Sequence, residues 1–334
     1  MTVNLLTHPL DIDMKIFVTR NIPTVGIDKL TAAGHEVVVS QKDGVLTAEE
    51  LIEQLTKENP DAVLCLLTDK IDGKIFDAAP NAKIFANYAV GFDNIDLEEA
   101  KKREILITNT PDVLTEAVAE HAVALMLSLG RRVVESDRFL RDGKYQGWGP
   151  MLLTGMEFKG KTLGIAGCGR IGQRVATIMN KGFGMDIVYY DQNRNEGLEK
   201  ETGAKFMPKL DDLLAVSDVV SVHLPATPET NHLFNQGRLA KMKSNALLIN
   251  TARGSVVDEA ALAEALKAGV IAGAALDVFE NEPDVHPDLL TLSNIVITPH
   301  TASATREARD LMSAMAADNI IAALSGQPVL NPVV

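Results

Sequence analysis

The chain has 334 residues, about twice the length of a usual single domain, so we expect two domains. Hydrophobic residues make up 46% of it, which is ordinary for a globular protein and argues against general disorder. The formal net charge is −13 and no run is rich in Lys or Arg, so nucleic acid and anionic membranes are disfavoured as partners.

The two cysteines, Cys65 and Cys168, form neither a CxxC pair nor a zinc pattern, so we expect no metal site and no disulfide framework. Cys168 is either a plain small residue, which we favour, or an oxidation-sensitive thiol. Residues 1–13 lack the basic and apolar regions of a secretory signal and are expected to form a frayed extension before the first strand. No run reaches the roughly 20 apolar residues of a spanning helix, and we expect a cytoplasmic, reducing location.

The first third of the chain alternates predicted strands and helices. Pro23 near its start and Gly34 just past its end mark one helix, and Thr47 with Glu50 forms a capping box for another. The expected strands are 15–19, 36–39, 62–66, 83–86 and 105–107, and the two helices are 23–33 and 47–57. This alternation predicts a parallel sheet with helices on both faces. The region lacks a glycine-rich nucleotide fingerprint, so no cofactor site is expected in it.

Residues 115–141 are expected to form one long helix. Its apolar residues recur at helical spacing but also occupy other faces, so it is predicted to be buried or to lie in an interface. A glycine-containing loop follows at 141–156 and carries the only tryptophan, Trp148.

The most informative motif is Gly167-Cys168-Gly169-Arg170-Ile171-Gly172. A predicted strand at 161–166 precedes it, a predicted helix at 173–179 follows it, and a second strand at 186–190 ends next to an acid, Asp191. This context predicts a βαβ unit with the dinucleotide-binding fingerprint.

Each glycine of the motif has a physical role. Gly167 permits a tight turn, Gly169 lets the backbone approach a pyrophosphate, and Gly172 lets the helix pack closely on the strand. The start of the helix offers unpaired N–H groups and a partial positive charge to the phosphates.

Four more strands and a last helix complete the expected elements. The strands are 218–223, 245–249, 272–276 and 294–298, and the helix is about 304–324. Since this helix comes after the last strand, we expect it to pack back on the N-terminal domain and make that domain discontinuous in sequence.

Three side chains that suit dehydrogenase chemistry follow the carboxyl ends of predicted strands, where doubly wound sheets bind ligands: Arg253, Glu282 and His300. Taken singly, each is more often a structural or surface residue. Their joint position after a dinucleotide fingerprint favours a site in which His300 donates or accepts a proton, Glu282 fixes its tautomer, and Arg253 binds a substrate carboxylate as a planar fork.

Six stretches carry a resemblance to a known family: residues 87–96, 160–164, 167–172, 250–254, 277–283 and 298–300. Through them the chain resembles the D-isomer-specific 2-hydroxyacid dehydrogenases over essentially all of residues 15–330. Within that family, residues 87–96 and 147–150 most resemble the glyoxylate/hydroxypyruvate reductases. The resemblance implies an α/β protein with two doubly wound parallel-sheet domains and a cleft between them. A flavodoxin-like substrate domain would comprise 14–110 and 304–334, and a Rossmann NAD-binding domain would comprise 111–303, including the helix at 115–141.

The resemblance also implies the roles of individual residues. The catalytic set is Arg253, Glu282 and His300. The cofactor-binding set is Gly167, Gly169, Arg170, Ile171, Gly172, Asp191, His223, Pro225, Thr230, Thr251, Ala252, Asp277 and His300. The substrate-binding set is Val90, Gly91, Trp148, Arg253 and His300. By contrast, His121 is expected to be a packed core or interface residue.

Asp191 determines the expected cofactor, because a carboxylate there accepts hydrogen bonds from ribose hydroxyls and repels a 2′-phosphate. We therefore favour NAD over NADP, although Arg194 offers a cation that could weaken the preference.

The predicted activity is the reversible reduction of a small 2-oxo acid, glyoxylate or hydroxypyruvate, to the (D-)2-hydroxy acid. One alternative is the same chemistry on a different 2-oxo acid. Another is a binding protein similar to the dinucleotide-sensing corepressors. We expect a homodimer formed through the helix at 115–141, the alternative being a helix buried within one chain. Trp148 would then either help to close a partner's active site or simply pack in the interface.

Overall fold

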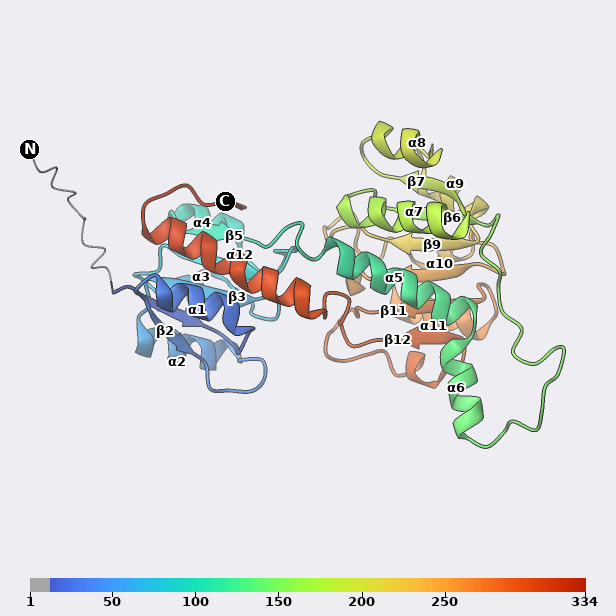
Figure 1. Cartoon of the computed structure of the whole chain (residues 1–334), viewed down its shortest axis with the longest axis horizontal. Helices are drawn as coiled ribbons and strands as arrows, with labels where there is room; N and C mark the ends of the chain where they lie inside the picture. Colours follow the sequence, from blue (N-terminus) through green and yellow to red (C-terminus); the bar gives the residue numbers. More distant parts are fainter. Residues whose placement is uncertain (1–12) are drawn as a thin grey trace, which may run out of the picture. The chain divides into compact units, whose positions relative to one another are not determined.

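The computed structural model describes residues 13–334 (Figure 1). The extension expected at residues 1–13 lies outside the described residues, except for Asp13. The described chain forms two compact units. We call residues 13–114 with Thr305–Val334 the terminal unit, and Thr115–Ala304 the central unit.

The terminal unit contains a five-stranded parallel sheet with strand order β2-β1-β3-β4-β5, which is the flavodoxin-like order that we expected. Its strands are β1 (Lys15–Val18), β2 (Glu36–Val39), β3 (Ala62–Leu66), β4 (Ile84–Tyr88) and β5 (Leu106–Thr108). Its helices are α1 (Thr24–Ala32), α2 (Ala48–Glu58), α3 (Gly73–Ala78), α4 (Leu97–Lys102) and α12 (Arg306–Leu324). The capping box predicted for α2 is present, with Thr47 and Glu50 each accepting a backbone N–H of the other.

The last helix, α12, packs against the N-terminal part of the chain within the terminal unit. The Ser313 hydroxyl on α12 accepts the Gly26 N–H of α1 at 3.0 Å. A Cβ atom on Gly26 would overlap the Ser313 backbone, so glycine permits this close crossing. Beyond α12 the chain returns to β5, where the Ile107 N–H donates to the Val334 carbonyl at 2.9 Å.

The central unit contains a seven-stranded parallel sheet with strand order β12-β11-β10-β9-β6-β7-β8. This is the Rossmann order 3-2-1-4-5-6 with one more strand at its edge. The strands are β6 (Thr162–Ala166), β7 (Asp186–Tyr190), β8 (Lys205–Phe206), β9 (Val219–Val222), β10 (Leu247–Asn250), β11 (Gly273–Leu276) and β12 (Ile295–Ile297). The helices are α5 (Thr115–Gly130), α6 (Val133–Arg141), α7 (Arg170–Phe183), α8 (Glu196–Thr202), α9 (Leu210–Val216), α10 (Gln236–Leu239) and α11 (Glu259–Lys267), with 3₁₀ turns η1 (Gly254–Val256) and η2 (Leu289–Thr291).

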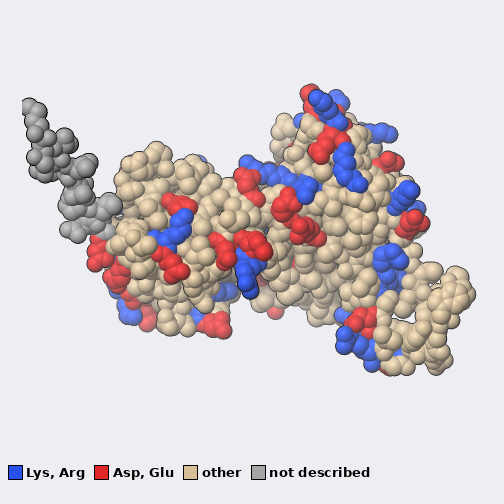
Figure 2. Space-filling model, viewed as in Figure 1, with Lys and Arg blue, Asp and Glu red and all other residues tan. Residues whose placement is uncertain are grey.

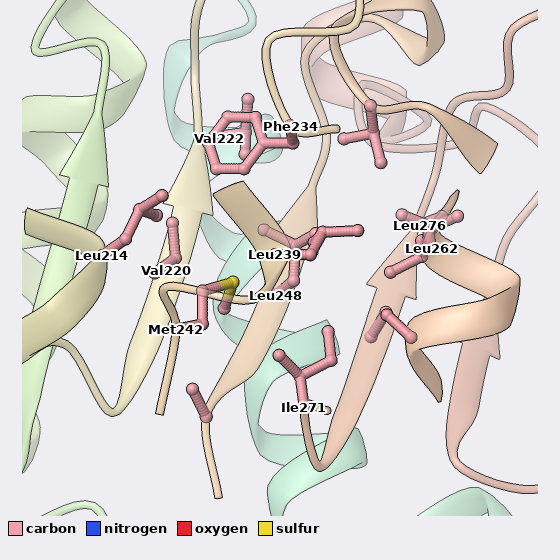
Figure 3. Close-up of a cluster of buried hydrophobic side chains, with 14 of the residues drawn as sticks. Leu214, Val220, Val222, Phe234, Leu239, Met242, Leu248, Leu262, Ile271 and Leu276 are labelled. Atoms are coloured by element: carbon pink, nitrogen blue, oxygen red, sulfur yellow. The ribbon is translucent and has the colours of Figure 1, made fainter. Parts of the chain in front are cut away.

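Both faces of this sheet are covered by buried apolar side chains. On one face α9, α10 and α11 cover the sheet, and α9 lies against β6 and β7; Figure 3 shows part of this cluster around Phe234 and Leu248. On the other face α5, α7 and α8 contribute residues such as Met126 and Val175. A sheet buried on both faces explains why its strands read as continuous apolar runs in the sequence.

The expectation of one helix over 115–141 was wrong. The structure breaks it into α5 and α6, with Arg132 in the left-handed region at φ 54°. At the break, Gly130 packs against the ring of Phe158, which a Cβ atom would overlap. The break therefore lies where the helix contacts a segment that is distant in sequence. The short strand β8 was not predicted either.

Candidate active site

The glycine turn after β6 has the backbone form that a dinucleotide needs. Gly167 has φ +96°, and a Cβ atom on it would lie 2.6 Å from the His223 carbonyl oxygen. A Cβ atom on Gly172 would overlap the Gly167 carbonyl, so this glycine sets the close approach of α7 to the turn. By contrast, no atom lies within 4 Å of the Cβ position of Gly169, which leaves open space beside the turn. These features fit the pyrophosphate of a dinucleotide.

α7 begins directly after this turn, with Arg170 and Ile171 in its first turn and Gly169 as its N-cap residue. No side chain among the described residues caps this end, so its N–H groups and positive dipole end suit an anionic ligand. The adjacent Cys168 is buried, and burial, followed by the charge of Asp191, raises the pKa of its thiol to about 12. It is therefore an unreactive small residue, the reading that we favoured.

Asp191 follows β7 and is fixed by the glycine turn. Its Oδ2 accepts the Cys168 N–H at 2.6 Å, and its Oδ1 accepts the Asn193 N–H at 3.3 Å. A shallow pocket of about 500 Å³ lies here, lined by Cys168, Gly169, Asp191, Asn193, Arg194, Asn195 and Glu196. The carboxylate thus lines a pocket next to the pyrophosphate turn, where the ribose of a dinucleotide would lie.

Arg253 follows β10 in a tightly packed loop. Asn250 is fully buried, and its side chain accepts the Ala252 N–H at 3.0 Å and donates to the Arg253 carbonyl at 2.9 Å. Next to it, a Cβ atom on Gly254 would overlap the backbone of Phe279. The loop that carries Arg253 therefore packs directly against the loop that leads to Glu282.

His300 and Glu282 form a pair. The Nδ1 atom of His300 lies 2.8 Å from the Oε2 atom of Glu282, and the Glu282 Oε1 atom accepts the Phe279 N–H at 3.0 Å. Partial burial would raise the pKa of Glu282, but the hydrogen bond and charge of His300, with smaller contributions from Phe279 and Arg253, lower it overall. Glu282 is therefore an ionised acceptor for one ring nitrogen of His300, which leaves the Nε2 atom for a substrate.

Asp277, which follows β11, organises the turn that carries His300. Its buried carboxylate accepts hydrogen bonds from the Thr298 hydroxyl at 2.6 Å and from the Thr301 and Ala302 N–H groups, both at 2.8 Å. His121 on α5 also reaches this carboxylate, with Nε2 3.3 Å from Oδ1. Our reading of His121 as only a packing residue missed this contact, because nothing in the sequence links positions 121 and 277.

The other residues expected around the cofactor lie at the carboxyl ends of β9 and β10. Thr251 is buried and its hydroxyl has no hydrogen-bond partner in the described structure, which suits a ligand contact. His223 bonds to the Ser221 hydroxyl at 2.9 Å, and burial lowers its pKa to about 4, so it is neutral near pH 7. The Thr230 hydroxyl donates to the Pro225 carbonyl at 2.7 Å and shapes the loop after β9.

Val90 and Gly91 lie in the terminal unit, after β4. Their carbonyls are held by the side-chain amides of Asn109 and Asn87, both at 2.8 Å. Within residues 13–334, neither the Val90 nor the Gly91 N–H donates a hydrogen bond to the protein. Rigid N–H donors without an internal acceptor are suited to bind a carboxylate, and the asparagines that fix them were not singled out from the sequence.

A glycine turn that fits a dinucleotide, a pocket lined by Asp191, and the polar residues Arg253, Glu282 and His300 after parallel strands are together typical of nicotinamide-dependent dehydrogenases. Residues 123–302 match the model of the D-isomer-specific 2-hydroxyacid dehydrogenase NAD-binding domain. The chain is 50% identical over 316 residues to a glyoxylate reductase of Korarchaeum cryptofilum, covering 94% of this chain and 93% of that one. It is 51% identical over 316 residues to a glyoxylate reductase of Thermofilum pendens, covering 94% and 92%. The chain belongs to the D-isomer-specific 2-hydroxyacid dehydrogenase family, as the resemblance implied.

Solved structures agree with this assignment. A Thermus thermophilus protein superposes with a TM-score of 0.89 at 43% identity, covering 96% of this chain and 100% of the other. An NADPH-dependent glyoxylate/hydroxypyruvate reductase of Sinorhizobium meliloti, solved with NADP and malonate, has a TM-score of 0.84 at 35% identity and covers 97% of both chains. The predicted pair of parallel-sheet α/β domains, one of them a Rossmann NAD-binding domain, is confirmed. Within the described residues, no helix is long and apolar enough to cross a membrane.

Proposed function

We propose that this protein reduces a small 2-oxo acid, glyoxylate or hydroxypyruvate, to the corresponding 2-hydroxy acid with NADH. The observation that carries the proposal is the 2.8 Å pair between His300 and the ionised Glu282, next to the loop of Arg253. The names of the relatives support the choice of substrate, since the two described above are glyoxylate reductases.

We propose the following residue roles, which this geometry supports. Bound NADH supplies a hydride to the carbonyl carbon of the substrate. His300 donates the proton from Nε2 to the carbonyl oxygen, because its Nδ1 is engaged by Glu282. The Glu282 carboxylate accepts a hydrogen bond at Nδ1 and holds the ring in this orientation. In the reverse direction His300 accepts the proton from the hydroxyl group of the substrate.

Substrate carboxylate binding is assigned to Arg253, whose planar guanidinium makes paired hydrogen bonds with a carboxylate. We propose that the N–H groups of Val90 and Gly91 also bind this carboxylate, and that the terminal unit acts as the substrate domain. Their unused donor capacity supports the first part of this proposal.

We propose NAD as the preferred cofactor, because the fixed Asp191 carboxylate would accept ribose hydroxyls and repel a 2′-phosphate. The Sinorhizobium meliloti relative is described as NADPH-dependent, so the preference has to be measured for this chain.

A single assay tests the activity. The purified protein is mixed with NADH or NADPH and a panel of 2-oxo acids, and absorbance at 340 nm is followed. We expect glyoxylate or hydroxypyruvate to have the highest kcat/KM and NADH to exceed NADPH. The highest value with another 2-oxo acid would replace the substrate, and no turnover with any acid would favour a dinucleotide-sensing binding protein.

We also propose a homodimer, formed through α6 and the loop after it. Large apolar side chains are exposed there: Val133, Leu140, Tyr145, Trp148 and Met151. The loop projects from the central unit, and Figure 2 shows it as a protrusion made largely of uncharged residues. Exposed apolar patches of this kind mark protein interfaces. Trp148, of which 84% is exposed, would reach the partner subunit and help to close its active site. A cytoplasmic location fits the two free cysteines.

A further inference from the structure

Arg194, the cation next to the ribose pocket, is held by an acid on α8. Its Nε donates to Glu199 Oε1 at 2.7 Å, and its Nη2 donates to Glu199 Oε2 at 2.8 Å. This two-point geometry is the most specific form of an arginine–carboxylate pair. Arg194 also lines the pocket that contains Asp191.

The Glu199 carboxylate is itself held by a tyrosine of the buried sheet. The Tyr189 hydroxyl donates to Glu199 Oε1 at 2.6 Å and accepts the Asn195 N–H at 2.7 Å. Tyr189 is a fully buried residue of β7, so the carboxylate has a rigid anchor. The hydrogen bond from Arg194, followed by that from Tyr189, lowers the pKa of Glu199 to about 2. Glu199 therefore remains ionised at any pH at which the protein would work.

We infer that Glu199 is a positioning residue for coenzyme selectivity: it withholds Arg194 from the 2′-phosphate that distinguishes NADP from NAD. To bind that phosphate, Arg194 would have to break both hydrogen bonds to Glu199. It would also leave an anchored carboxylate without its cation, close to a new dianion. NAD has no group at this position, so the penalty falls on NADP alone, and selectivity is a difference of affinities.

This inference rests on the proposed preference for NAD and adds a second residue to it. Asp191 would repel the phosphate directly, whereas Glu199 would act by engaging Arg194, which lines the same pocket. Figure 2 shows basic and acidic side chains close together over α8, which is the surface on which this competition takes place.

Binding rather than turnover tests the inference. The Kd values of NAD⁺ and NADP⁺ are measured by isothermal titration calorimetry, without substrate, for the wild type and for Glu199→Gln. We expect the substitution to lower the Kd of NADP⁺ by about three- to fivefold, the worth of one exposed ion pair, and to change that of NAD⁺ by less than about twofold. The matched control is Glu201→Gln, which removes the same charge from the exposed end of α8 and should leave the NADP⁺ to NAD⁺ ratio unchanged.

Two further variants separate release of Arg194 from a loss of negative charge. Adding Arg194→Ala to Glu199→Gln should abolish the gain in NADP⁺ affinity. Arg194→Ala alone should leave the weak NADP⁺ affinity of the wild type unchanged, and this variant keeps the test open if Glu199→Gln does not fold. A gain that survives the loss of Arg194, an unchanged Kd in Glu199→Gln, or a marked loss in Arg194→Ala alone would each overturn the inference. Equal Kd values of the wild type for both dinucleotides would instead contradict the proposed preference for NAD.

Discussion

At the scale of single residues, His300 stands on an unusual backbone. Its φ of 52° lies in the left-handed region, which costs a non-glycine residue about 1 kcal/mol. The Asp277 carbonyl accepts the His300 N–H at 2.8 Å, and the Asp277 carboxylate accepts the N–H groups of the next two residues. The buried aspartate therefore holds the turn in a conformation that presents the imidazole to Glu282.

Replacing Glu282 tests the pair directly. Glu282→Gln removes the carboxylate that orients the imidazole for proton transfer, so we expect kcat/KM for 2-oxo acid reduction to fall roughly 100-fold. The matched control is Asp284→Asn, an exposed acid two residues further along the same loop, which should retain activity. Steady-state kinetics with NADH from pH 5 to 9 provides the measurement. An unchanged kcat/KM in Glu282→Gln would remove Glu282 from the mechanism.

At the scale of elements, the site depends on loops that follow parallel strands and pack on one another. The loop after β10 contacts the loop after β11 through Gly254 and Phe279, with no space for a side chain. The start of α11 also holds the second loop: the Glu280 carboxylate accepts the Glu259 N–H at 2.7 Å, and the Glu280 N–H donates to Glu259 Oε1 at 2.6 Å. Strand ends bring the functional residues near each other, and these loop contacts determine their final positions.

Two glycine-to-alanine substitutions distinguish the effect of steric overlap between loops from the effect of helix propensity on stability. In Gly254→Ala the new methyl group would meet the Phe279 backbone, so we expect the free energy of unfolding to fall by about 1–3 kcal/mol, together with weaker substrate binding. In Gly182→Ala, within α7, the methyl group meets nothing within 4 Å, and we expect a gain of about 0.5–1 kcal/mol from helix propensity. Urea unfolding midpoints measure both. Equal effects of the two substitutions would contradict the close packing of the two loops.

The ion pair between His232 and Glu280, which lies in the loop after β11, leads to a prediction about how stability depends on pH. His232 Nε2 lies 2.9 Å from Glu280 Oε2, and its Nδ1 lies 4.0 Å from Asp258 Oδ2. The hydrogen bond to Glu280 raises the pKa of His232 above its ordinary 6.5. A raised folded-state pKa contributes stability that is fully present below the unfolded pKa and is lost as pH rises through the folded pKa.

We therefore expect His232→Gln to lower the free energy of unfolding at pH 5.5 and to have a smaller effect at pH 8.5. The side chain of His232 is 42% exposed, so solvent screening should keep the difference below about 1 kcal/mol. Denaturant titrations at the two pH values measure it. A larger effect at alkaline pH would have the wrong sign and would exclude the pair as the cause.

At the scale of the whole molecule, two units of related architecture contain different parts of the proposed machinery. The central unit contains the dinucleotide turn and the Arg253, Glu282 and His300 set, and the terminal unit contains the Val90 and Gly91 donors. The central unit also exposes the apolar surface of α6 and the following loop. The proposed dimer would bury this surface, which a monomer leaves in water.

A charge on α6 tests the dimer. The chain has a mass of 36.0 kDa, so light scattering should give about 72 kDa for the wild type (2 × 36.0). Leu140→Lys places a charge on the proposed interface and should shift the mass toward that of the monomer. Leu290→Lys is the control, because Leu290 is equally exposed, at 59% against 60%, but lies outside this surface. A monomeric wild type, or two variants that behave alike, would contradict the assignment.

Local sequence patterns predicted most of this fold because their causes are local. The capping box of Thr47 and Glu50, the glycine turn at Gly167 and the acid at the end of β7 depend on neighbours within a few residues or within one βαβ unit. Arg253, Glu282 and His300 could be named because each follows a strand, and parallel strands end at the same edge of a sheet. The His300–Glu282 distance itself could not be read from spacing.

Tertiary structure decided the features that depend on segments distant in the chain. Phe158 contacts Gly130 at the end of the helix from Thr115, and Asp277 contacts His121 on the same helix. Packing also decides contacts over a short stretch of chain: Glu199 pairs directly with Arg194, and the Tyr189 hydroxyl of β7 donates to Glu199. Each of these pairs is specified by packing and hydrogen bonding after the sheets have formed. The sequence alone therefore predicted the class of chemistry and the residues proposed to perform it, whereas the three-dimensional contacts decided how those residues are oriented and which charges remain available to a cofactor.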